Sequence, residues 1–271
     1  GVAEVLGSVP SVNNLRLTPL GTAATITVAS GGTVTQAATG ASVSVPANAL
    51  VAAGGGAAPA TADVRVTAID IGSDSNLLSG DFTDSSGTQV QAYGSVVLSS
   101  STALDVVGGQ LLTLQIPLSN RSALTPASAT LYYLDVATGR WVADGSANLV
   151  AGAQPHYTAD VTRFAQWMVG TAITATQTVS GCVLDDAGAP AANVRIAADG
   201  INYSSIAYTT TNAQGQFTLQ LPTSSRTAVQ GRRGAFLTNA TAVDVQSVPI
   251  SLLTCLPIPT TNAATMRLTW G

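Results

Sequence analysis

Short runs in which apolar and polar side chains alternate recur along this chain, and they constrain its fold more than any other feature. In residues 64–71, for example, Val64 and Val66 alternate with Arg65 and Thr67. Successive side chains of a β-strand point to opposite faces of the sheet, so each run predicts a strand with one buried face. Predicted strands of this kind are 23–29, 33–36, 42–45, 64–71, 90–99, 111–118, 129–135, 140–143, 157–161, 164–169, 179–184, 193–198, 205–211, 216–221, 228–230, 242–248 and 265–270.

Glycine-marked turns separate these runs, and no window carries a sustained 3.6-residue period. A helix is conceivable for residues 47–53, where three consecutive glycines, Gly54 to Gly56, would end it. Many short strands at regular spacing are typical of β-sandwiches. The fold class that follows is all-β: two tandem antiparallel β-sandwiches with very little helix.

The charge content is low for a globular protein. Charged residues make up 9% of the 271 residues and apolar residues 46%, with a mean hydropathy of +0.34. Disordered chains combine low hydropathy with high charge, so this composition indicates a folded protein. No run of about 18 apolar residues occurs, so no membrane-spanning helix is expected.

The inventory of reactive side chains is nearly empty. All ten basic residues are arginines, so phosphate-binding loops with lysine, Schiff bases and lysine isopeptide bonds are excluded. His156 is the single histidine, and a loop histidine is favoured over a general base because no nucleophile marks a partner for it. The net charge of −4 with scattered arginines offers no stripe for nucleic acid. An enzyme would need a cleft with paired aspartates, which no motif supports, so we expect no enzymatic activity.

The two cysteines, Cys182 and Cys255, lie 73 positions apart and belong to no metal-binding motif. We expect them to form a disulfide, which fits an exported protein. The alternative is a pair of buried free thiols.

Four aspartates gather within fifteen residues, with serine and asparagine between them: Asp70, Asp74, Asp81 and Asp84. Calcium takes six to eight oxygen ligands, and such a loop offers several. Because the spacing is not that of an EF-hand, a solvated polar loop is the favoured interpretation and a calcium site the alternative. No other cofactor is expected.

The second half of the chain carries one family pattern. It reads Val-Ser-Gly-Cys-Val at 179–183, Asp186 to Pro190, Val194, and Thr211 to Phe217. This pattern resembles the carboxypeptidase regulatory-like domain, a transthyretin-like sandwich that is usually a passive module of envelope or extracellular proteins. Apart from the resemblance, Gly188 and Gly215 fit turn positions with positive φ.

The first half carries another family pattern, which resembles the β-sandwich of the cartilage-intermediate-layer-protein group, related to a sandwich of ankyrins and netrin receptors. The pairing of this sandwich with a following transthyretin-like domain is part of the resemblance. The residues that carry it are Gly31 to Thr33, Ser44 to Leu50, Gly80 to Phe82, Tyr93-Gly94, Ile116-Pro117, Leu131 to Asp135, Gly139 to Trp141 and Arg163 to Trp167.

Three segments follow from these patterns. Residues 1–22 form an N-terminal extension, which is a linker or a docking strand. Residues 23–172 form the cartilage-intermediate-layer-protein-like sandwich, and residues 177–271 the carboxypeptidase regulatory-like one. Trp141 and Trp167 are expected to be core or half-buried residues, whereas Trp270 on the last strand would plug a core or contact another molecule.

The favoured hypothesis is a non-enzymatic extracellular structural or adhesive protein: a subunit of a bacterial surface filament that self-assembles through β-strand contacts. Natural sheets guard their edges with lysine and other charges, which are scarce here. The alternative is a monomeric envelope or lipid-anchored module that binds a surface glycan or protein. We expect a secreted or cell-surface location with the signal peptide already removed, other copies of the chain as partners, and no nucleic acid.

Self-cleaving relatives of the first sandwich carry His-Phe-Ser at the turn that corresponds to Arg163, Phe164 and Ala165. Here an arginine replaces the base and a methyl group replaces the nucleophile, so the turn is degenerate and we expect no autoproteolysis. Purified chain should give one intact band on denaturing electrophoresis. Two fragments that divide before Ala165 would contradict this expectation.

Overall fold

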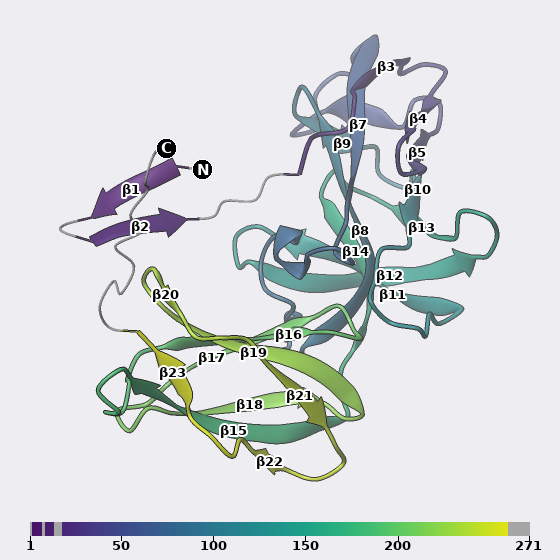
Figure 1. Cartoon of the computed structure of the whole chain (residues 1–271). Helices are drawn as coiled ribbons and strands as arrows, with labels where there is room; N and C mark the ends of the chain where they lie inside the picture. The colour runs from purple at the N-terminus through teal and green to yellow at the C-terminus, as the bar shows by residue number, and fades with distance from the viewer. Residues whose placement is uncertain (1, 7–8, 14–17, 260–271) are drawn as a thin grey trace, which may run out of the picture. The chain divides into compact units, whose positions relative to one another are not determined.

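The computed structural model describes residues 2–6, 9–13 and 18–259, and the chain divides into two compact units (Figure 1). The large unit comprises Arg16–Ile173 with Tyr203–Ser205; the small unit comprises Gly1–Leu15, Thr174–Asn202 and Ile206–Gly271. The all-β prediction is confirmed, because one short 3-10 turn, η1 (Ser75–Leu77), is the whole helix content of the described residues.

Ten strands of the large unit form one antiparallel sheet in the order β3-β7-β8-β14-β11-β12-β13-β10-β5-β4. Two further strands, β6 and β9, pair with each other. The bounds are β3 (Ala24–Thr27), β4 (Gly32–Gln36), β5 (Ala41–Val45), β6 (Leu50–Ala52), β7 (Thr61–Ile69), β8 (Val90–Ser100), β9 (Leu104–Val106), β10 (Leu112–Pro117), β11 (Ser128–Asp135), β12 (Arg140–Val150), β13 (His156–Val161) and β14 (Gln166–Ala172).

The two edges of this sheet approach each other. Strands β3 and β4 are consecutive, and a bridge between Thr27 and Gly31 joins their ends. At the far end of β4, the side-chain Oε1 of Gln36 accepts the backbone N–H of Ala68 on β7 at 2.8 Å. The sheet therefore curls into a nearly closed structure around one core.

The alternation that predicted the strands also builds this core. In β10, Leu112, Leu114 and Ile116 are fully buried, whereas Gln115 between them is exposed. Full burial of one such aliphatic side chain contributes roughly 1.5–3 kcal/mol. Trp167 and Tyr157 pack in the same cluster, and Trp141 is also fully buried, so the prediction of core tryptophans at these two positions is confirmed.

The small unit stacks two sheets (Figure 1). One has the order β18-β15-β22, with β23 also on β15; the other has the order β17-β16-β19-β20, with β21 also on β19. The bounds are β15 (Thr176–Asp185), β16 (Arg195–Gly200), β17 (Ile206–Thr210), β18 (Gln216–Pro222), β19 (Ser225–Arg233), β20 (Phe236–Leu237), β21 (Thr241–Val245), β22 (Ile250–Ser251) and β23 (Leu256–Ile258).

Two glycine turns of the small unit have the backbone that the sequence predicted. Gly188 has a φ of +79° and Gly215 a φ of +70°. A Cβ atom on Gly215 would lie 2.5 Å from the carbonyl oxygen of Val183, so the turn before β18 requires glycine for space as well.

A disulfide joins Cys182 on β15 to Cys255, the residue before β23, with their Cα atoms 4.5 Å apart. Both β22 and β23 run parallel to β15, unlike the antiparallel pairs elsewhere. Cys182 and Cys255 directly precede the paired residues Val183 and Leu256, so the disulfide links β15 to β23 where their pairing begins.

Several strands were not predicted. Strands β1 (Val2–Leu6) and β2 (Val9–Asn13) form a separate two-stranded sheet within the N-terminal extension. The helix considered for residues 47–53 is wrong, because Leu50 is fully buried and begins β6. The predicted strand 265–270, with Trp270, lies outside the described residues.

Removal of the disulfide should destabilise the small unit. In the chain-entropy model, a loop of this length loses about 4 kcal/mol of stabilisation when the cross-link is absent. Chemical denaturation of a Cys182→Ser, Cys255→Ser double variant should show this loss, whereas Thr254→Ala, an exposed neighbour, should leave stability unchanged. An unchanged unfolding midpoint in the double variant would contradict the expectation.

Candidate functional site

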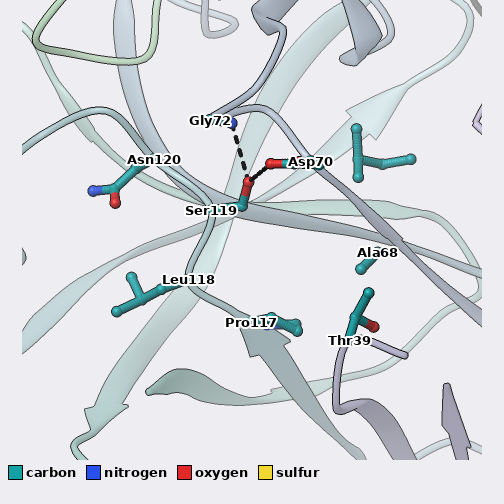
Figure 2. Close-up of a pocket in the computed structure, with 9 residues that line it drawn as sticks. Thr39, Ala68, Asp70, Gly72, Pro117, Leu118, Ser119 and Asn120 are labelled. Carbon is teal, nitrogen blue, oxygen red and sulfur yellow. Dashed lines mark hydrogen bonds between the residues drawn. The ribbon is translucent and has the colours of Figure 1, made fainter. Parts of the chain in front are cut away.

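One pocket of the large unit combines a carboxylate with hydroxyl and apolar groups (Figure 2). It has a volume of about 510 Å³ and lies where the loop after β7 meets the loop after β10. Its lining residues are Thr39, Ala68, Ile69, Asp70, Gly72, Pro117, Leu118, Ser119 and Asn120.

The polar centre of the pocket is the contact between Asp70 and Ser119. The Ser119 hydroxyl donates to Asp70 Oδ1 at 2.5 Å and accepts the backbone N–H of Gly72 at 3.0 Å. Figure 2 shows both hydrogen bonds converging on the serine oxygen. The backbone N–H of Ser73 also donates to Asp70 Oδ1, at 3.2 Å. The serine thus fastens the β7 loop to the β10 loop, 49 residues further along the chain.

These hydrogen bonds hold the pKa of Asp70 below its ordinary value of 3.8, with the Ser119 hydroxyl as the largest cause. A carboxylate with a lowered pKa is a weak base, so Asp70 is unsuited to remove a proton from Ser119. His156 faces Pro117 across the β10–β13 pair, but it does not line the pocket, and its Nδ1 lies 3.0 Å from the carbonyl oxygen of Gln154. The arrangement suits binding and bracing rather than nucleophilic catalysis.

The rest of the pocket offers a mixed surface. Ala68, Pro117 and Leu118 supply an apolar wall. The Nδ2 atom of Asn120 is buried without a hydrogen-bond partner among the described residues, and in Figure 2 the amide points away from the Asp70–Ser119 pair. No aromatic side chain lines the pocket, so the stacking surface that sugar-binding sites use is missing from its described walls.

The structure does not bring the four aspartates of the proposed calcium loop into one cluster. Asp70 binds Ser119, whereas Asp74 caps η1 and accepts the backbone N–H of Asn76 at 3.0 Å. Across the described part of the chain, no three histidine, cysteine or acidic residues lie together as a metal site would require.

The other two aspartates each have their own donors. Asp81 lies 3.2 Å from the guanidinium of Arg140, and its backbone oxygen accepts the indole N–H of Trp141 at 2.8 Å. Asp84 accepts the backbone N–H groups of Ser86 and Thr88. The Asp81 carboxylate therefore links its loop to β12, whereas the Asp84 carboxylate stabilises its own turn.

The turn that corresponds to the self-cleavage site is built around a cation. The Arg163 guanidinium lies 3.4 Å from Asp144 and 4.2 Å from the centroid of the Tyr133 ring. Phe164 packs against the core of the large unit, and the backbone oxygen of Ala165 accepts the N–H of Leu98 at 2.9 Å. These contacts give Arg163, Phe164 and Ala165 structural roles at the bend between β13 and β14.

Sequence reasoning missed Ser119 and the pocket itself. Ser119 follows a predicted strand and belongs to no motif, and its partner Asp70 was grouped with its neighbours in sequence. No local signal could have joined two loops that only the folded sheet brings together.

Comparisons with known proteins leave the family open. No protein-family model matches the chain, and no curated protein matches it in sequence. Among the described residues, no helix is long and apolar enough to cross a membrane.

The Asp70–Ser119 contact predicts a pH-dependent contribution to stability. Because folding lowers the pKa of Asp70, its contribution is present above the unfolded pKa and is lost as the pH falls through the folded value. Ser119→Ala removes the largest cause, so the Asp70 pKa followed by NMR should rise towards its ordinary value.

The same variant should lose less stability than the unmodified chain as the pH falls below the unfolded pKa of an aspartate. The difference is expected to stay below about 1 kcal/mol, because Asp70 is exposed and water screens it. Ser122→Ala, whose hydroxyl bonds to Leu124 instead, is the matched control. An Asp70 pKa that does not change in Ser119→Ala would contradict the assignment.

Proposed function

We propose that this chain is a non-enzymatic extracellular structural protein whose copies associate through the edges of their β-sheets, as the subunit of a bacterial surface filament does. One observation carries the proposal: the outer edge of β18 is long, unpaired among the described residues and free of charge. A strand edge of this kind is a template for pairing with another chain.

Strand β18 pairs with β15 and with no other described strand. It spans seven residues, Gln216–Pro222, none of them charged. Its solvent-facing side chains, Gln216, Thr218 and Gln220, are polar and neutral. The cross-strand neighbours Thr176, Thr178 and Ser180 on β15 are neutral as well, so no charge repels an approaching strand on this face.

The other edges of the small unit are blunted. Strand β21 carries Asp244, which lies 3.5 Å from Arg226 on β19. Strand β17 carries Tyr208, and the guanidinium of Arg195 stacks 4.1 Å from its ring centroid. Strands β22 and β23 have two and three residues, and β23 contains Pro257. Charges, short length and proline are the devices by which natural sheets protect their edges.

The edges of the large unit are protected in another way. Its edge strands β3 and β4 have four and five residues, and they meet as the sheet curls. The Gln36 side chain accepts a hydrogen bond from the N–H of Ala68, which would otherwise have no acceptor where the two edges of the sheet meet. Among these edges of the two units, β18 is therefore the least protected.

An extracellular location is supported by the disulfide, because structural disulfides persist in oxidising compartments. Together with its few reactive side chains, this favours a protein that builds a surface structure over one that catalyses a reaction.

A second candidate is a monomeric envelope module that binds a glycan or a protein, and the Asp70–Ser119 pocket is the observation that favours it. Its open carboxylate and apolar wall would suit a small polar ligand better than a sugar ring, because no aromatic side chain lines it. If a concentrated solution of the purified chain contains monomers alone, this second candidate is favoured over the first.

Purified chain should assemble as its concentration rises, with fibres visible by negative-stain electron microscopy and larger species in analytical ultracentrifugation. Gln220→Lys places a charge on the β18 edge and should raise the concentration needed for assembly roughly tenfold, which corresponds to about 1.4 kcal/mol. High salt should partly reverse the effect by screening the charge.

Thr178→Lys is the matched control. Thr178 pairs with Gln220 across the sheet and accepts its side-chain N–H at 2.9 Å, so both variants lose the same hydrogen bond. The control places its charge one strand inward and should assemble more readily than Gln220→Lys. A chain that stays monomeric at every concentration would overturn the proposed function.

A further inference from the structure

The backbone of β18 has a defined inner and outer side. Gly215, just before the strand, accepts the N–H of Val183 on β15 at 2.8 Å. The next residue, Gln216, turns away from β15: its N–H donates to Asn212 Oδ1 and its carbonyl accepts the N–H of Asn212, both at 2.9 Å. Because backbone groups alternate along an antiparallel strand, odd-numbered residues face β15 and even-numbered residues face outward.

Thr218 and Gln220 therefore direct their backbone N–H and carbonyl groups away from the sheet. No described residue donates to or accepts from these four groups. Pro222 ends the edge, since it has a carbonyl but no N–H. The open ladder covers two complete donor–acceptor pairs.

The two faces of β18 set the pattern that an added strand must have. Phe217, Leu219 and Leu221 are buried in the core, whereas Thr218 and Gln220 are exposed. An added strand continues the sheet only if its own side chains alternate in the same way, apolar towards the core side and polar towards water.

One segment of the chain outside the described residues has this pattern and is not otherwise assigned. Residues 265–270 place Met266, Leu268 and Trp270 on one face of an extended strand, and Thr265, Arg267 and Thr269 on the other. Six residues extend about 20 Å as a strand, which is close to the length of β18.

We propose that residues 265–270 of one copy add as a further strand to the outer edge of β18 in a second copy. This inference rests on the proposed function and names the segment and the edge that meet. The backbone groups of Thr218 and Gln220 bond to the added strand, and Met266, Leu268 and Trp270 extend the core side of the sheet.

The strand order favours a neighbouring copy over the same chain. Strand β23 lies on the opposite side of β15 from β18, and it runs parallel to β15 as far as Ile258, opposite Asp185. To reach its own β18 edge, the chain would have to pass the end of β15, cross two strand spacings of about 4.8 Å each and reverse direction within residues 259–264. A segment that extends to a second copy needs no such reversal.

A contact of this kind is heterologous, because the donated segment and the receiving edge are different surfaces of the chain. Repeated contacts of this kind give an open filament unless the rotation between copies closes a ring. Each copy then uses one edge and one segment, and only the terminal copies retain a free edge or a free segment.

A mixing experiment with two defective variants tests the proposal. Thr218→Pro removes an outward N–H that β15 does not use and should block the receiving edge. A chain that ends at Ala264 lacks the donated segment. Each variant alone should remain monomeric in analytical ultracentrifugation, and an equimolar mixture should form a one-to-one dimer without fibres.

Two further measurements keep the outcome clear. Thr218→Val retains the N–H and should assemble as the unmodified chain does, which controls for the loss of the hydroxyl. In the unmodified chain, hydrogen–deuterium exchange at the amides of Thr218 and Gln220 should slow at least tenfold on assembly, and this readout does not depend on the proline variant folding.

The outcomes separate this inference from the proposed function. If the full chain assembles while these two amides exchange as fast as in the monomer, the β18 assignment is overturned, whereas the assembly itself still agrees with the proposed function. Fibres from the chain that ends at Ala264 would show another occupant, such as the β1–β2 hairpin, and would overturn the assignment of residues 265–270. Slow exchange already in the monomer would show that the chain covers its own edge, which also overturns the inference.

Discussion

Backbone pairing between neighbouring strands is the constraint on which the rest of this structure depends. With so few charged residues, the described chain has little electrostatic means to select one arrangement over another. The register of each strand pair decides which side chains are buried, since a shift of one residue would turn Leu112, Leu114 and Ile116 of β10 towards water. The disulfide and the short loop hydrogen bonds secure positions that this pairing has already defined.

The two units satisfy the same constraint differently. In the large unit the edge strands meet, and the Gln36 side chain accepts a hydrogen bond from a backbone N–H of β7 at that point. In the small unit the strand order leaves two layers with edges, and short length, a proline and paired charges protect most of them. The edge of β18 is seven residues long and uncharged, and its proline, Pro222, lies at its last position. The low charge content is therefore compatible with a closed sheet, but it leaves the edge of an open sheet available for pairing.

The sequence predicted those parts of the fold that depend on local alternation. Strands such as β7, β10 and β18 were recognisable because their buried and exposed residues alternate, and Gly188 and Gly215 because a turn there requires positive φ. Strand β6 was not predicted, because three residues carry too little periodicity, and an alanine-rich stretch around Leu50 also suits a helix.

The pocket could not be predicted for a different physical reason. Asp70 and Ser119 meet because β7 and β10 end near each other in the curled sheet, and neither residue carries a local signal of its partner. The four aspartates showed the converse: they are close in sequence, but each finds its donors in its own turn or across the sheet. Short polar side chains bond to nearby backbone groups at little entropic cost, so proximity in sequence is weak evidence for a shared site.

The scarcity of charge also links the proposed assembly to specificity. A neutral edge attracts any extended strand through its backbone groups, so selection has to come from side-chain alternation and from the length of the open ladder. Strand β18 offers two outward donor–acceptor pairs, bounded by the Asn212 turn at one end and Pro222 at the other. A longer partner strand gains no additional backbone hydrogen bonds. A partner strand with a charge on its apolar face places that charge against the core side of the sheet. An edge of this kind discriminates by length and pattern, which are properties that a segment of the same chain can match in every copy.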